Sequence, residues 1–237
     1  MSGTTLDNWA SKIANFMVAE LELEPGDTVV LDLPATWQAL CIILGAQRAG
    51  VRIITAADAA DSEEPFAIFT VVDRADSWAS TCEDAYIVVV TDDVFGRGVV
   101  ECGISLPDGA IDFGPEVRLQ PDAYLGIFDV KNDTTAALIG ALSTAEINKM
   151  ASDSTRANAQ TSTSESESLR LVSWGWQDPT TLSNDQLAEF VAGALCYPWL
   201  NNGCAIVVRK NPEVDAEAQS ARLHRIAEVE KATIAGT

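Results

Sequence analysis

Residues 28–55, TVVLDLPATWQALCIILGAQRAGVRIIT, decide the fold of this chain. The run Thr28–Leu33 is β-branched and apolar without alternation, which is typical of a parallel strand covered on both faces. Ala35–Ala49 has a helical pattern, and Val51–Thr55 is a second apolar run. A strand, a helix and a strand in this order form a right-handed parallel crossover. The sequence therefore predicts an α/β fold with a mostly parallel sheet flanked by helices.

Similar patterns continue outside this stretch. Apolar residues at helical spacing predict a helix at Thr5–Leu21 with Asp7 in its first turn. Further helices are expected at Ser77–Glu83 (a short helix or a loop), Thr144–Ala159, Asn184–Trp199 and Ala216–Ile234, and strands at Phe66–Val72, Tyr86–Thr91, Leu169–Trp174 and Cys204–Val208. Residues 95–124 are rich in glycine and proline, which predicts turns and a short strand at Glu116–Leu119.

These patterns place all 237 residues in one α/β domain. The domain is expected either undivided or as two packed lobes, at about residues 1–130 and 131–237. The segment 161–168, TSTSESES, is polar and free of aromatic residues, so we expect a flexible loop there.

Charge limits the classes of partner. The chain has 15 basic and 35 acidic residues, which gives a net charge of −20. Such a charge repels the phosphates of nucleic acids and of anionic membranes. No apolar run approaches the roughly 20 residues that a membrane-spanning helix needs. We therefore expect an acidic cytoplasmic protein with neither nucleic acid nor a membrane as partner.

Residues that carry catalysis or bind metals are few. The five cysteines include no Cys-x-x-Cys pair, and Cys41 and Cys204 lie in apolar stretches where we expect them to be buried. His224 is the only histidine, and a metal site would need further ligands. The chain contains neither Gly-x-Ser-x-Gly nor Gly-x-Gly-x-x-Gly. We expect no catalytic residue, no metal and no cofactor.

Two stretches carry a family resemblance. Leu6–Ile54, with its Pro-Gly-Asp turn and its helix ending in Arg-Ala-Gly, resembles the N-terminal region of the AMP-dependent acyl-CoA synthetases, which are adenylate-forming enzymes. Leu169–Arg209 resembles the strand, loop, helix and strand that form the substrate pocket in that family. Nearly the whole chain also resembles short actinobacterial proteins of unknown function that are related to this region. The resemblance implies the fold of the N-terminal subdomains of adenylate-forming enzymes.

The same resemblance implies a phosphate loop of the form Ser/Thr-Ser/Thr-Gly-Thr-Thr-Gly-x-Pro-Lys-Gly. The corresponding segment here is Asn132–Gly140, and its matching residues are Thr134, Thr135 and Gly140. Asp133 and Ala136 stand in place of glycines, and Ile139 stands in place of the lysine. An aspartate repels phosphate, and side chains at former glycines block close approach of the backbone. We therefore interpret this segment as a degenerate phosphate loop.

A ligand site is expected after a strand, because ligands of open α/β sheets bind beyond the carboxyl ends of the strands. The candidate residues are Trp174, Trp176, Gln177 and Asp178. The two indoles would form apolar walls, and Gln177 and Asp178 would bind an amino group. The alternative is that the tryptophans fill an interface between the two lobes.

The function expected from these features is that of a pseudoenzyme. A truncated relative of the acyl-CoA synthetase N-terminal domain would lack adenylation activity and act as a binding or interaction module. Its partner would be a small acyl or aromatic ligand, a second copy of the chain or another protein. The alternative is an enzyme: either an ATP-dependent acyl-adenylate-forming enzyme completed by a partner chain, or an enzyme with different chemistry.

Overall fold

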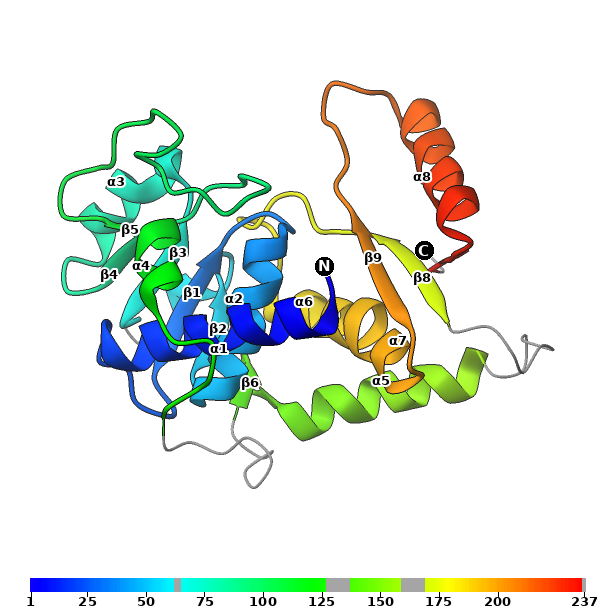
Figure 1. The fold of residues 1–237 in the computed structure, drawn as a ribbon, viewed down its shortest axis with the longest axis horizontal. Coiled ribbons are helices and arrows are strands. Elements are labelled where there is room, and N and C mark those ends of the chain that lie inside the picture. Colours follow the sequence, from blue (N-terminus) through cyan, green and yellow to red (C-terminus); the bar gives the residue numbers. More distant parts are fainter. Residues whose placement is uncertain (62–64, 127–136, 159–168, 236–237) are drawn as a thin grey trace. The chain divides into compact units, whose positions relative to one another are not determined.

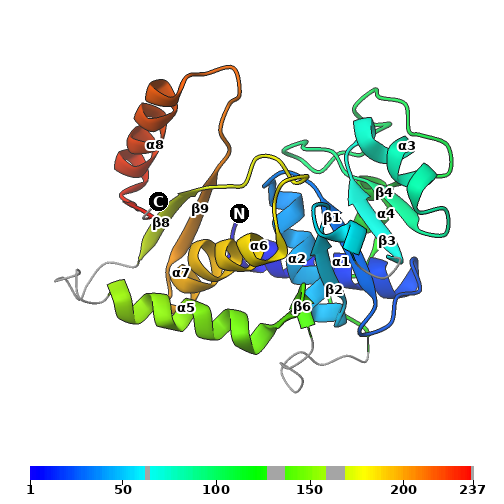
Figure 2. The ribbon, with the colours of Figure 1, turned by 180° about the vertical axis from the view of Figure 1, so that it is seen from behind.

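The structure, a computed structural model, describes residues 1–61, 65–126, 137–158 and 169–235, and the side chains of all of these except 154–158. Two compact units are present in it. The first comprises Met1–Thr144 and Asp178–Asn184, and the second comprises Ala145–Gln177 and Asp185–Thr237. Figures 1 and 2 show the elements from opposite sides. The loop expected at 161–168 lies outside the described residues, and the division into two packed lobes stays a prediction.

The first unit contains a seven-stranded sheet in the order β5–β4–β3–β1–β2–β6–β7. Its strands are β1 (Thr28–Asp32), β2 (Arg52–Thr55), β3 (Ala67–Thr70), β4 (Tyr86–Val89), β5 (Ile111–Asp112), β6 (Ala137–Ile139) and β7 (Leu142–Ser143). All neighbouring strands are parallel except β6 and β7. This arrangement confirms the predicted α/β fold and the parallel crossover at residues 28–55.

Helices cover both faces of this sheet (Figures 1 and 2). On one face, the Phe113 ring of α4 (Phe113–Leu119) lies 6.4 Å from Phe16 of α1 (Gly3–Ala19) and 6.3 Å from Phe69 of β3. On the other face, α3 (Val72–Thr81) packs Ala75 and Trp78 against an apolar cluster of the strands. Burial on both faces explains why the strands read as continuous apolar runs.

Helices α1 and α2 (Trp37–Ala49) pack closely because a glycine lies at their contact. A Cβ at Gly45 would lie 2.6 Å from Cγ2 of Ile13, which leaves no room for a side chain. The Thr36 hydroxyl accepts a hydrogen bond from Ala39 N and caps α2. Helix α1 begins at Gly3, so Asp7 does not lie in its first turn as predicted.

Residues 113–119 form a helix, and the strand predicted at Glu116–Leu119 is wrong. Pro115 lies in the first turn of α4, where its missing N–H costs no helical hydrogen bond. Phe113 and Val117, four residues apart, are both buried, which is a helical spacing hidden in a short segment. Helix α3 also differs from the prediction, because it begins at Val72 and ends at Thr81.

The second unit contains a parallel three-stranded sheet in the order β10–β8–β9. Its elements are α5 (Thr144–Asn158), β8 (Arg170–Trp174), α6 (Asn184–Phe190), a π-helix at Val191–Cys196, α7 (Tyr197–Leu200), β9 (Cys204–Val208), α8 (Ala216–Glu230) and β10 (Thr233–Ile234). Leu223 and Ala227 of α8 pack against Val172 and Val208 of the sheet. Strands β8 and β9 confirm the predictions for these segments.

Three predictions in this unit need correction. The helix predicted at Asn184–Trp199 is α-helical in α6, becomes a π-helix at Val191–Cys196 and is α-helical again in α7. At the end of the π-helix, Tyr197 N donates to Ala192 O, and Pro198 has no N–H to donate. The last helix ends at Glu230, because Lys231 adopts a left-handed conformation with φ 49° and the chain continues as β10. Cys204 is exposed, whereas Cys41 is buried and its burial raises the pKa of the thiol to about 12.

Both sheets contain a reversal in the direction of the crossovers. In the first unit, β1 lies between β2 and β3, the next two strands in the chain. In the second unit, β8 lies between β9 and β10 in the same way. Ligands of open α/β sheets bind at such reversals, beyond the carboxyl ends of the strands. The ends of β1 and β3, and the end of β8, are therefore the places to search for a site.

Candidate functional site

The carboxyl edge of the first sheet is lined with buried polar residues. Each of four parallel strands ends in one of them. They are Asp32 of β1, Thr55 of β2, Thr70 of β3 and Asp112 of β5. A polar side chain buried at a strand end needs partners, since its transfer from water is otherwise costly. The partners of Asp32 and Thr70 therefore show what holds the centre of this edge together.

Asp32 is the centre of a hydrogen-bond network at the reversal between β1 and β3. Its Oδ2 accepts from Thr70 Oγ1 at 2.6 Å, from Arg74 Nε at 2.7 Å and from Trp78 Nε1 at 2.7 Å. Arg74 Nη2 also donates to the Asp32 backbone oxygen at 2.8 Å. The two donors of α3 are four residues apart, so they lie on one face of that helix.

The other oxygen of this carboxylate has no partner. The Asp32 side chain is 0% exposed, so no water reaches Oδ1, and this oxygen also receives no hydrogen bond within the described residues. Gln38 Oε1 and Thr55 Oγ1 are buried without a partner in the same sense. Each such group costs about 1–3 kcal/mol of desolvation. The first unit thus keeps unused hydrogen-bonding capacity at the ends of β1 and β2 and at the start of α2.

Asp178 belongs to the first unit, and its charge interacts with that of Arg74. Its Oδ1 accepts from Thr180 Oγ1 at 2.6 Å and from Thr180 N at 2.9 Å. The Thr180 hydroxyl, the Thr180 backbone N–H and the Arg74 guanidinium lower the pKa of the Asp178 carboxyl. The Asp178 carboxylate, which the sequence predicts to bind a ligand, already caps the turn that it begins.

The other three predicted ligand residues belong to the second unit and differ in environment. Trp174 ends β8 at the reversal of the crossovers, and Lys210 Nζ lies 5.6 Å from the centroid of its ring. Trp176 is only 8% exposed and packs edge to face on Phe190 with ring centroids 5.1 Å apart. Gln177 Nε2 donates to Gly175 O at 2.8 Å. Trp174 is thus the more accessible of the two indoles.

The segment predicted to be a degenerate phosphate loop is described by the structure only at its end. Thr134 and Thr135 lie outside the described residues. Ile139 is a fully buried residue of β6, and Gly140 N donates to Ile53 O at 2.8 Å. Gly140 has φ 55°, and a Cβ there would lie 2.9 Å from Cβ of Asn184. The end of the segment is therefore a strand and a tight turn before β7.

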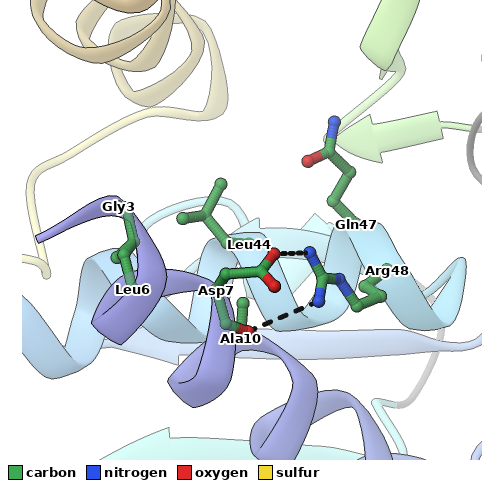
Figure 3. Close-up of a pocket in the computed structure, with 7 residues that line it drawn as sticks. All are labelled: Gly3, Leu6, Asp7, Ala10, Leu44, Gln47 and Arg48. Atoms are coloured by element: carbon green, nitrogen blue, oxygen red, sulfur yellow. Dashed lines mark hydrogen bonds and ion pairs between the residues drawn. The ribbon is translucent and has the colours of Figure 1, made fainter. Parts of the chain in front are cut away.

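A separate cavity of about 220 Å³ lies between α1 and α2 (Figure 3). Its lining residues are Gly3, Leu6, Asp7, Ala10, Leu44, Gln47 and Arg48. Arg48 Nη2 donates to Asp7 Oδ1 at 2.6 Å, and Arg48 Nη1 donates to Ser11 Oγ at 2.5 Å. The charges in this cavity are therefore satisfied by each other, and it offers little to a charged ligand.

Metal ligands do not gather in the described part of the chain. No group of three or more His, Cys, Asp or Glu side chains there could hold a metal ion. His224 is exposed, and its Nδ1 lies 2.8 Å from Ser220 O on its own helix. No helix among the described residues is long and apolar enough to cross a membrane.

Known proteins resemble this chain in sequence and in fold. No family model matches it. A curated relative, the "TIGR03089 family protein" of Mycobacterium tuberculosis, is 27% identical over 214 residues, which are 89% of this chain and 81% of that protein. Acetoacetyl-CoA synthetase from Streptomyces lividans has a TM-score of 0.65 at 17% identity over 96% of this chain and 36% of that one.

Two further structures extend the comparison. The N-terminal domain of FACL13 from Mycobacterium tuberculosis has a TM-score of 0.62 at 14% identity, covering 100% of this chain and 55% of that one. The anthranilate CoA ligase AuaEII, in complex with anthranoyl-AMP, has a TM-score of 0.61 at 12% identity, covering 92% and 42%. The fold is that of the N-terminal domains of adenylate-forming enzymes. The chain spans between 36% and 55% of the length of these three structures.

Within this adenylate-forming fold, sequence reasoning missed the network of Asp32, Thr70, Arg74 and Trp78. One signal was available, because Asp32 interrupts an apolar strand near its carboxyl end. Its donors lie 38 to 46 residues further along the chain, and no local pattern connects them. The resemblance to acyl-CoA synthetases, by contrast, rests on short motifs and agrees with the structural neighbours.

Proposed function

We propose that this chain is a binding module with the adenylate-forming fold that does not itself form adenylates. The end of the phosphate-loop segment supports this proposal. Gly140 N–H is already bonded to Ile53 O, and Ile139, in place of the loop lysine, is a buried strand residue. A phosphate loop holds its anion with free backbone N–H groups and a lysine ammonium, and both are lost at these two positions.

Charge adds to this loss. The chain has a net charge of −20, so a nucleotide triphosphate would be repelled unless local donors compensated. One of these negative charges, that of Asp133, belongs to the same segment of the sequence. We therefore infer that ATP with magnesium does not bind in the manner of an adenylate-forming enzyme.

The ligand that we propose is a small acyl or aromatic molecule bound at the end of β8. Trp174 and Gln177 would contact it, and the buried ring of Trp176 would support the loop from beneath. The aromatic class is supported by AuaEII, a protein of similar fold whose complex contains anthranoyl-AMP. Because Asp178 belongs to the other unit and caps its own turn, it is not part of the proposed site.

Thermal unfolding in the presence of ligands tests the proposal, because a ligand that binds the native state raises the unfolding temperature. We expect no shift with magnesium and ATP, and a shift with benzamide or anthranilate that Trp174→Ala abolishes. Phe95→Ala, which removes an exposed aromatic ring from the first unit, is the matched control and should leave the shift unchanged.

An assay for pyrophosphate release gives the result that would contradict this proposal. If the chain released pyrophosphate from ATP in the presence of anthranilate, the proposal would be wrong. The alternative of an adenylate-forming enzyme would then be favoured.

A further inference from the structure

The connection between β9 and α8 carries basic charge in an acidic protein. Arg209 and Lys210 follow β9 directly, and Arg222 lies in the second turn of α8. Parallel strands direct their carboxyl ends to one edge, so this connection begins at the same edge of the second sheet as Trp174. That edge is the one where ligands of open α/β sheets bind.

Lys210 lies against the indole of Trp174. Its Nζ is 5.6 Å from the ring centroid, which is within the range of a cation–π contact. The ammonium group has three hydrogens, and a ring face engages only one side of it. The remaining donors are available to an anion next to the ring.

The backbone of this connection is anchored from α8. Arg222 Nη1 donates to Arg209 O at 2.7 Å, and Gln219 Nε2 donates to Asn211 O and to Val214 O. Gln219 is buried, so its two bonds are partly shielded from water. Lys210 is therefore attached to a fixed segment, and less conformational entropy is lost when it engages a ligand.

Within the described residues, Lys210 and Arg222 make no salt bridge, whereas Arg48, Arg74 and Arg118 each pair with an acidic side chain. The acidic residues nearest to Lys210 in sequence are Glu213 and Asp215, and the Asp215 carboxylate is engaged as the cap of α8 through Ala218 N. Lys210, beside the indole, and Arg222, bonded to the backbone of the preceding residue, thus keep their capacity to bind an anion.

We propose that Lys210 and Arg222 form an oxyanion site beside Trp174, which takes a carboxylate or phosphate group whose apolar body lies against the indole. Lysine supplies a compact charge, and the arginine fork can donate two parallel hydrogen bonds to such a group. The inference rests on the proposed ligand site at the end of β8. It explains how a chain of net charge −20 can still bind an anionic small molecule.

Isothermal titration calorimetry with three matched probes tests this site. Benzoate and phenyl phosphate carry the two oxyanions on one aromatic ring, and benzamide is the neutral analogue. We expect at least one oxyanion probe to bind more tightly than benzamide. Lys210→Gln should weaken that probe about tenfold or more, since a charge-assisted hydrogen bond is lost, and should leave benzamide unchanged.

Charge-matched variants separate this effect from damage to the fold. Lys149→Gln removes an exposed charge from α5 and should leave all three affinities unchanged. Lys210→Arg keeps the cation and should retain most of the binding, and Arg222→Gln should weaken the oxyanion probe without weakening benzamide.

Each outcome has a defined meaning. Preference for benzoate or for phenyl phosphate identifies the source of the oxyanion. Equal affinities of all three probes, or no binding of either oxyanion, would overturn the site. Benzamide binding that depends on Trp174 would then still support the proposed function. Conversely, pyrophosphate release from ATP would contradict the proposed function and leave a Lys210-dependent preference intact.

Discussion

One carboxylate oxygen of Asp32 accepts three hydrogen bonds, and the other accepts none within the described residues. Its side chain is 0% exposed, and that of Arg74 is 33% exposed. A buried charge of this kind is tolerated only while its partners remain, because the ion pair and its hydrogen bonds offset the cost of desolvation. The bonds to Thr70, Arg74 and Trp78 tie β1, β3 and α3 together at the edge where the crossovers reverse.

Replacing Asp32 tests this role. We expect Asp32→Asn to lower the free energy of unfolding by about 2–4 kcal/mol, because the amide leaves Arg74 without its counter-charge and buries an NH2 group without an acceptor where Oδ1 lies. The control is Glu101→Gln, which removes an exposed ion pair with Arg118 and should cost clearly less than Asp32→Asn. Urea unfolding measures both, and equal losses would contradict the network.

Asp93 provides a pH-dependent test. Its hydrogen bonds with the Arg97 side chain and backbone lower the pKa of this carboxyl from 3.8 to about 2. Because the pKa is lower in the folded state, the stabilisation is complete above pH 3.8 and is lost as the pH falls through about 2. In Arg97→Gln, a carbon-13 NMR titration should show the Asp93 inflection moving up toward 3.8. An unchanged inflection would mean that Arg97 is not the cause.

The hairpin of β6 and β7 contains the end of the segment predicted to be a phosphate loop. Gly140 turns the chain between these strands with φ 55°, and Asn184 occupies the space where a side chain would begin. Asn184 Oδ1 also accepts from Thr55 N at 2.8 Å, so the asparagine is held in this place. The end of the phosphate-loop segment is thus packed against the first sheet.

Substitution of two glycines measures this packing. Gly140→Ala should lower the free energy of unfolding more than Gly103→Ala, by about 1 kcal/mol or more. Both positions have positive φ and share the strain of a left-handed alanine, but a Cβ at Gly103 meets nothing within 4 Å. Urea unfolding of the two variants gives the difference. If the two losses were the same, the segment at Gly140 would be looser than described.

The whole molecule combines two units with cores of different size. The first has a seven-stranded sheet covered on both faces, and the second has three strands with a core cluster of Val172, Val208, Leu223 and Ala227. Local stability follows the amount of buried apolar contact. The unit with the proposed ligand site is therefore expected to open more readily.

Native-state hydrogen exchange tests this difference. Amides of β1 and β3 should exchange at least about tenfold more slowly than those of β8 and β9, because opening the smaller core costs less free energy. A ligand at the end of β8 should slow exchange in the second unit selectively. Equal protection of the two sheets would show that the molecule opens as one cooperative unit.

Local chemistry was sufficient to predict the crossover at residues 28–55, the end of β8 and most of the long helices. Continuous apolar runs, helical spacing and turn residues act over a few neighbours, and the sequence displays them directly. The short helix α4, the π-helix and the end of α8 were predicted wrongly. Proline placement and a left-handed residue decide them within a single turn.

The sequence by itself determined the kind of fold and predicted a degenerate phosphate loop at Asn132–Gly140. Tertiary structure alone decided which strands reverse the crossovers, which donors meet Asp32 and that Lys210 lies over Trp174. The physical reason is that these contacts join residues far apart in the chain. Their geometry depends on how whole strands and helices pack, and no short pattern of residues records it.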